Sequence, residues 1–147
     1  NLALACDLVF CARSARFAQS FARVGLVPDC GGMYLLPRLI GLHKAKQLMF
    51  TGDIIDAAQA GEWGLVNQVV DDNKLAETVA AWAARLAKGA PTAISFMKQV
   101  LNRSDNLDLR TILDYEANLQ SICMRTADHA EGVAAFKEKR EPVFTGK

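Results

Sequence analysis

The segment Gly25-Leu-Val-Pro-Asp-Cys-Gly-Gly32 sets the organisation of this chain, because it places turn-forming residues directly before an apolar stretch from Met33 to Ile40. Proline, aspartate and glycine are residues that tight turns favour. The pattern predicts a loop that leads into a helix, with Asp29 near the helix start. From these residues alone, Asp29 is favoured as the helix N-cap, a role that contributes about 0.5–2 kcal/mol.

Short strands and helices are predicted on both sides of this loop. Strands are expected at residues 7–12, 15–19 and 65–70, and helices at residues 44–50 and 56–63, the latter with Asp56 as its N-cap. So few strands do not make a sheet of ordinary width, and we therefore expect partner strands upstream of Asn1.

A helical period begins at Asp72, where Leu75, Val79, Trp82 and Leu86 follow one another at spacings of three and four. Further helices are predicted at residues 92–101, 109–124 and 128–140, the last ending before a proline. The predicted fold class is α/β, with a mixed region at residues 1–70 and a helical region at residues 71–147.

The composition narrows the classes of function. The 147 residues carry 17 basic and 16 acidic side chains, a balance that gives no broad surface for nucleic acid or for an acidic membrane. The apolar run from Leu2 to Ala12 is shorter than the roughly 20 residues of a membrane helix. Four cysteines without a CxxC pair, and two separated histidines, predict no metal site and a reducing, cytoplasmic compartment.

Several segments, in matching order and spacing, carry a family resemblance. They are Asn1-Leu-Ala-Leu-Ala-Cys-Asp7, Gly25 to Gly32, Leu36-Pro-Arg-Leu-Ile-Gly41, Thr51-Gly-Asp-Ile-Ile-Asp-Ala57, Gly64-Leu-Val-Asn-Gln-Val69 and Glu131-Gly-Val-Ala-Ala-Phe-Lys-Glu-Lys-Arg140. Together they resemble the C-terminal part of the enoyl-CoA hydratase/isomerase family, also called the crotonase family, over essentially the whole chain.

This resemblance implies a core of repeated ββα units wound into a superhelix, a helical C-terminal region that forms trimers or hexamers, and an acyl-CoA thioester as substrate without any cofactor. It also implies an oxyanion hole of two main-chain N–H groups upstream of Asn1. Because loss of one such donor costs about 10²–10³ in rate, we expect this chain by itself to be inactive.

The family register also bears on the reaction. The two glutamates of the family's hydratases fall on Asn1 and Phe21, neither of which is an acid or base, so two-glutamate hydration is disfavoured. The single carboxylate used by several family isomerases falls on Asp29. The resemblance therefore reverses the preference for an N-cap and predicts Asp29 as the catalytic base.

The expected function is an acyl-CoA isomerase that acts on the ring epoxide of phenylacetyl-CoA, as in phenylacetate degradation, or on an enoyl-CoA. The predicted substrate-binding residues are Phe21 and Leu26 near the acyl group, and Phe136 and Lys139 at the adenine and phosphate end of CoA. Phe21 as a core residue and Lys139 as a solvated charge remain open. The alternative functions are an enoyl-CoA hydratase, a dehalogenase and a non-catalytic oligomer-forming binding protein. The dehalogenase is disfavoured because the family dehalogenase has tryptophan at the position of Phe21.

Overall fold

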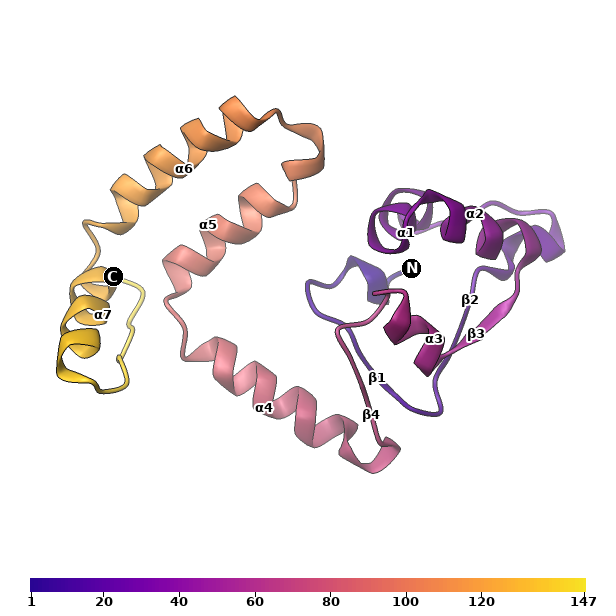
Figure 1. Cartoon of the computed structure of the whole chain (residues 1–147), viewed down its shortest axis with the longest axis horizontal. Coiled ribbons are helices and arrows are strands. Elements are labelled where there is room, and N and C mark those ends of the chain that lie inside the picture. The colour runs from indigo at the N-terminus through magenta and orange to yellow at the C-terminus, as the bar shows by residue number, and fades with distance from the viewer. The chain divides into compact units, whose positions relative to one another are not determined.

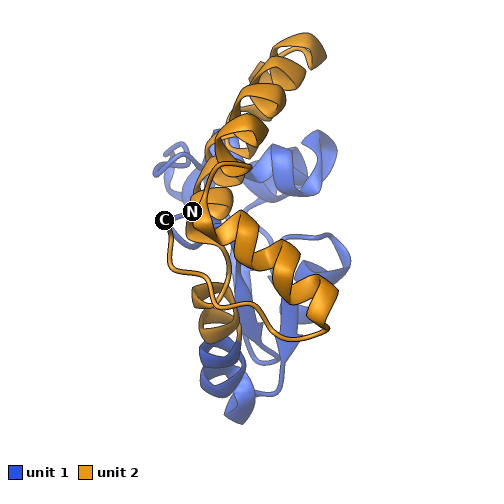
Figure 2. Ribbon diagram, turned by 90° about the vertical axis from the view of Figure 1, so that its left-hand side faces the viewer, with its two compact units in different colours: residues 1–81 blue, residues 82–147 orange.

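The computed structural model describes residues 1–147 and divides them into two compact units, residues 1–81 and residues 82–147 (Figure 2). The boundary falls inside helix α4 (Leu75–Ala87). The predicted division, between residues 70 and 71, remains a prediction.

The first unit combines short strands with helices and 3₁₀ turns (Figure 1). Its elements are η1 (Ala3–Ala5), β1 (Phe10–Ala12), β2 (Arg16–Ala18), η2 (Ser20–Val24), α1 (Gly32–Ile40), α2 (Leu42–Thr51), β3 (Ile54–Asp56), α3 (Ala57–Glu62), β4 (Gln68–Val70), η3 (Asp72–Lys74) and the first part of α4. The three predicted strands are present, each shortened to three residues, and β3 is an additional strand that was not predicted.

The strands form two separate pairs. β1 and β4 are parallel, with Cys11 opposite Val69, and β2 and β3 are antiparallel, with Phe17 opposite Ile55. β1 and β4 lie side by side in Figure 1 although more than fifty residues separate them in the chain. The two pairs form separate two-stranded sheets.

Apolar residues from both helices and strands form the core of this unit. Leu36 of α1 and Leu48 of α2 are 1% and 2% exposed, and they belong to one buried cluster that also contains Ile55. α1 and α2 pack against each other and are separated by Gly41. The predicted N-cap at Asp56 is confirmed, because its carboxylate accepts a 2.9 Å hydrogen bond from the N–H of Gln59.

The second unit is helical and confirms the predicted helices with small changes of bounds. It contains the end of α4, α5 (Pro91–Leu101), the 3₁₀ turn η4 (Ser104–Asn106), α6 (Leu109–Cys123) and α7 (Ala127–Glu138). Asp108 caps α6 and Thr126 caps α7, each accepting a main-chain N–H of the first turn. α5 and α6 pack against each other (Figure 1). No helix in the structure is long and apolar enough to cross a membrane.

The C-terminal tail, residues 139–147, turns back along α7 (Figure 1). Asp128, which is 4% exposed, accepts hydrogen bonds from the N–H groups of Thr145 (2.7 Å) and Gly146 (2.9 Å). At the other end of the tail, the guanidinium of Arg140 forms a two-pronged ion pair with Glu131. These contacts make the tail part of the folded second unit.

Candidate active site

Asp29 lies in a tight turn that immediately precedes α1. The N–H of Gly32 donates a 2.8 Å hydrogen bond to the carbonyl of Asp29, and both central residues of the turn, Cys30 (φ 47°) and Gly31 (φ 78°), are in the left-handed region. Positive φ at both central residues is the geometry of a type I′ turn. Cysteine adopts this conformation at a cost of about 1–2 kcal/mol, so the turn stores backbone strain next to the predicted base.

The interpretation of Asp29 as a helix N-cap is wrong. α1 begins at Gly32 and its N-cap is Gly31, with no capping hydrogen bond from a side chain. The carboxylate of Asp29 is exposed and has no hydrogen bond or ion pair within the chain, because only its main-chain carbonyl is engaged. The side chain therefore remains available to an incoming ligand.

Asn1 contacts this turn from a distant part of the chain. Its Nδ2 donates a 3.1 Å hydrogen bond to the carbonyl oxygen of Asp29, and its Oδ1 accepts a 2.7 Å hydrogen bond from Nε2 of Gln19. Gln19 follows β2 and is 6% exposed. A carboxamide does not titrate in the ordinary pH range, so Asn1 and Gln19 hold hydrogen bonds here but do not exchange protons with a substrate.

Phe21 and Leu26 lie in the same short connection, between β2 and α1. The connection passes through η2 and then Gly25, whose φ of 72° turns the chain so that the N–H of Leu26 donates to the carbonyl of Phe21 (3.0 Å). Phe21 is half-buried and lies outside the buried core cluster, and Leu26 is 62% exposed. The structure thus places two of the predicted acyl-binding residues within eight residues of Asp29 on one loop.

Phe136 and Lys139 belong to the second unit, at the end of α7. Phe136 is 85% exposed, and Lys139 is the C-cap of the helix, with a left-handed φ of 56°. The predicted helix at residues 128–140 therefore ends earlier, at Glu138, because the chain reverses at Lys139. Both side chains are accessible to a ligand.

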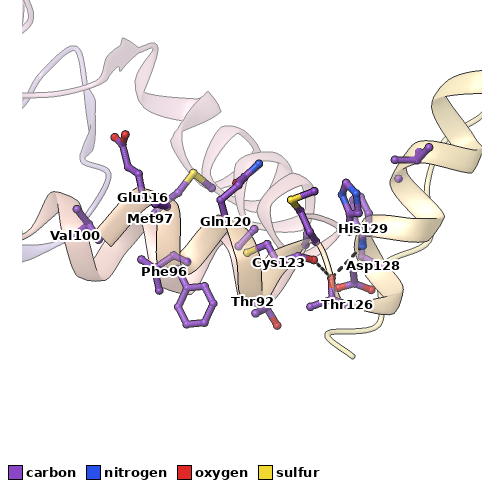
Figure 3. A pocket seen from close by; sticks show the side chains of 18 of the residues that line it. Thr92, Phe96, Met97, Val100, Glu116, Gln120, Cys123, Thr126, Asp128 and His129 are labelled. Carbon is purple, nitrogen blue, oxygen red and sulfur yellow. Dashed lines mark hydrogen bonds between the residues drawn. The ribbon is translucent and has the colours of Figure 1, made fainter. Parts of the chain in front are cut away.

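An open groove of about 1020 Å³ lies between α5, α6, α7 and the tail (Figure 3). Apolar side chains such as Phe96, Met97 and Phe136 contribute to its lining. At one end the hydroxyl of Thr126 donates to the carbonyl of Cys123 (2.8 Å) and accepts from the N–H of His129 (3.1 Å), as the dashed lines in Figure 3 show. Because apolar side chains contribute to its lining, the groove has the character of an apolar contact surface. The sequence patterns had not indicated this groove.

No group of three or more histidine, cysteine or acidic side chains is arranged to hold a metal ion. The four cysteines are free thiols. Burial raises the pKa of the Cys11 thiol, so this residue is a core side chain with little thiolate character. Asp29 remains the predicted catalytic residue of the candidate site.

Comparisons with known proteins identify the family of the chain. The family described as enoyl-CoA hydratase/isomerase matches residues 1–147. The chain is 46% identical to 1,2-epoxyphenylacetyl-CoA isomerase of Escherichia coli over its full length, which spans 56% of that protein. It is 39% identical over 93% of its length to a short-chain-enoyl-CoA hydratase of Clostridioides difficile, of which it covers 88%.

A solved structure gives the same answer for the fold. The crystal structure of an enoyl-CoA hydratase from Bacillus anthracis superimposes with a TM-score of 0.95 at 38% identity, covering 99% of this chain and 57% of that one. The predicted α/β crotonase-type fold is thereby confirmed, and the chain spans a little over half the length of this structure and of the Escherichia coli relative. The chain belongs to the enoyl-CoA hydratase/isomerase family.

Proposed function

We propose that the full-length protein is an acyl-CoA isomerase in which Asp29 is the single acid–base group. The observation that carries this proposal is the state of the Asp29 carboxylate, which is exposed and unpaired on a loop whose main chain is fixed by two hydrogen bonds. The positions of the paired glutamates of hydratases are occupied by Asn1 and Phe21, so neither of these positions supplies a second carboxylate.

The proposed reaction needs one base and a stabilised enolate. The carboxylate of Asp29 takes a proton from a carbon that the thioester activates, and the resulting acid returns that proton to another carbon of the same acyl group. Main-chain N–H donors of the full-length protein stabilise the charge on the thioester oxygen between the two steps. Atoms and charge balance without a cofactor.

The proposed substrates are the ring epoxide of phenylacetyl-CoA and enoyl-CoA thioesters. The 46% identity with 1,2-epoxyphenylacetyl-CoA isomerase supports the epoxide as a substrate. The aromatic side chain of Phe21 and the exposed side chain of Leu26, in the connection that leads to Asp29, also support it. Phe136 and Lys139 are proposed to contact the adenine and phosphate end of CoA, where an accessible ring and a cation suit stacking and ion pairing. Assembly as a trimer or hexamer is part of the same proposal.

The test compares the full-length protein with its Asp29→Asn variant, which keeps the shape of the side chain and removes the base. Rates of epoxyphenylacetyl-CoA and enoyl-CoA isomerisation should fall by about 10²–10⁴, the usual contribution of a general base. Asp114→Asn, at an exposed position of α6, is the matched control and should leave the rates unchanged. Equal rates for Asp29→Asn and the unaltered protein would refute the assignment.

Enoyl-CoA hydration is the second candidate, because a 39% identical relative is named a short-chain-enoyl-CoA hydratase. Hydration by the two-glutamate route needs carboxylates where this chain has Asn1 and Phe21. We therefore expect water addition to a short enoyl-CoA to be slower than isomerisation. Hydration that is faster and survives Asp29→Asn would favour the hydratase, whereas tight binding of CoA thioesters without turnover would favour a binding protein.

A further inference from the structure

We infer that Asn1 and Gln19 form a positioning pair that fixes the main chain of Asp29 and so aims its carboxylate. This inference rests on the proposed function, because it matters for rate only if Asp29 is the base. Asn1 is 28 residues from Asp29 and 18 residues from Gln19, yet its single side chain bonds to both.

The hydrogen-bond geometry uses both the donor and the acceptor group of the Asn1 amide. Oδ1 accepts from Nε2 of Gln19 at 2.7 Å, while Nδ2 donates to the carbonyl of Asp29 at 3.1 Å and lies 3.4 Å from Oε1 of Gln19. A primary amide carries N–H donors and a carbonyl acceptor on one group, and these contacts require both. A carboxylate at this position would have no proton to donate to Asp29.

Gln19 supplies the anchor of the pair. It is 6% exposed, and a buried amide without partners would cost free energy, so its contacts with Asn1 hold both side chains in one orientation. The Asp29 carbonyl then has two donors, the Asn1 amide and the N–H of Gly32 at 2.8 Å. The main chain of Asp29 is thereby held both by Gly32 of its own turn and by the side chain of Asn1.

Gly32 provides independent support for the same arrangement. A Cβ built on Gly32 would have the Asn1 amide as its nearest neighbour, at 2.4 Å from Nδ2, 2.5 Å from Cγ and 2.7 Å from Oδ1. Gly32 is buried and has no positive φ, so its backbone conformation does not require glycine. The approach of the Asn1 amide is what excludes a side chain there.

The experiment uses the full-length protein and measures kcat and KM for isomerisation. Asn1→Ala should lower kcat by roughly 10- to 100-fold with KM changed less than about twofold, because misplacing a catalytic group by about 1 Å costs up to about 10²-fold in rate. Asn1→Asp keeps the size of the side chain and its acceptor for Gln19, and should lower kcat in the same way. Gly32→Ala should do likewise by displacing the Asn1 amide.

The double variant Asn1→Ala/Gly32→Ala separates positioning from general damage. If Gly32→Ala acts through Asn1, the double variant loses no more kcat than Asn1→Ala alone, because the group with which the new methyl collides is already gone. Losses that multiply would show that Gly32 acts independently and would overturn that part of the argument.

Asn67→Ala is the matched control, since Asn67 also holds a main-chain group of the first unit, accepting from the N–H of Val9 at 2.7 Å. It should lower the melting temperature without lowering kcat. If Asn1→Ala and Asn1→Asp both keep kcat within about twofold while Asp29→Asn inactivates the enzyme, the positioning role is refuted and the proposed function stands. If Asp29→Asn is itself fully active, the proposed function fails. Should Asn1→Ala not fold, Asn1→Asp and Gly32→Ala decide the question.

Discussion

Replacement of Asp128 by alanine should release the C-terminal tail. The Asp128 carboxylate is 4% exposed and accepts main-chain hydrogen bonds through Oδ1 from Thr145 and through Oδ2 from Gly146. A hydrogen bond to a charged group contributes about 1.5–3 kcal/mol. The lower value applies to a surface tail whose freed N–H groups reach water, so the two bonds together give about 3 kcal/mol, or roughly a 10²-fold change in the opening equilibrium.

Hydrogen–deuterium exchange of the peptide covering residues 141–147, in the full-length protein, measures this opening directly. In Asp128→Ala the amides of Thr145 and Gly146 should exchange roughly 10²-fold faster. Asp128→Asn keeps one acceptor oxygen and should lose about half of that free energy, giving roughly tenfold. Asp108→Ala, which removes the cap of α6, should not alter the tail. Unchanged tail exchange in Asp128→Ala would refute the reasoning.

Three further predictions concern other contacts. Hydrogen bonds from Arg140 and from the N–H of Val143 lower the pKa of Glu131 from 4.5 to about 2. The stabilisation of the tail by the Glu131 carboxylate is therefore complete above about pH 4.5 and is lost as the pH falls toward 2. Hydrogen exchange of the tail should follow this pH dependence, and Glu131→Gln should abolish the dependence. Leu48→Ala, at a site 2% exposed, should destabilise the fold by about 2–5 kcal/mol in chemical denaturation, and a loss below about 1 kcal/mol would contradict the assigned packing. Cys30→Gly should raise the melting temperature by relieving about 1 kcal/mol of left-handed strain, whereas Cys30→Val should lower it; the opposite order would exclude strain at this turn.

Helices could be predicted from this sequence because their information is local. The spacing of Leu75, Val79 and Trp82 indicates α4, and Asp56 is recognisable as a cap from its own position before an alanine-rich turn. β3 (Ile54–Asp56) could not be predicted in this way, since three residues carry too little alternation. It is a strand because β2 lies opposite, with Phe17 facing Ile55, and that pairing spans almost forty residues of chain.

The same distinction between local and long-range information applies to the candidate site. The loop and the helix that follows it could be predicted from one segment, whereas the role of Asp29 as a base was predicted only from the family resemblance. The contacts of Asn1, Gln19 and Gly32 could not be predicted, because amide contacts between residues 18 to 31 positions apart leave no periodic signal. The N-cap interpretation of Asp29 was wrong for a local reason, namely that Cys30 and Gly31 use two left-handed residues for the turn, which leaves Gly31 as the cap.

Asp29 differs from three other aspartates of this chain that lie at helix starts. Asp56, Asp108 and Asp128 each use the carboxylate to accept main-chain N–H groups at a helix start or at the tail, and such a role accounts for an aspartate by stability alone. The carboxylate of Asp29 has no such role, because its turn is closed by the main-chain carbonyl. Asp29→Asn therefore removes a charge and a base without removing a hydrogen bond of the folded chain. A loss of turnover in that variant, with an unchanged melting temperature, would have to arise from chemistry at the carboxylate.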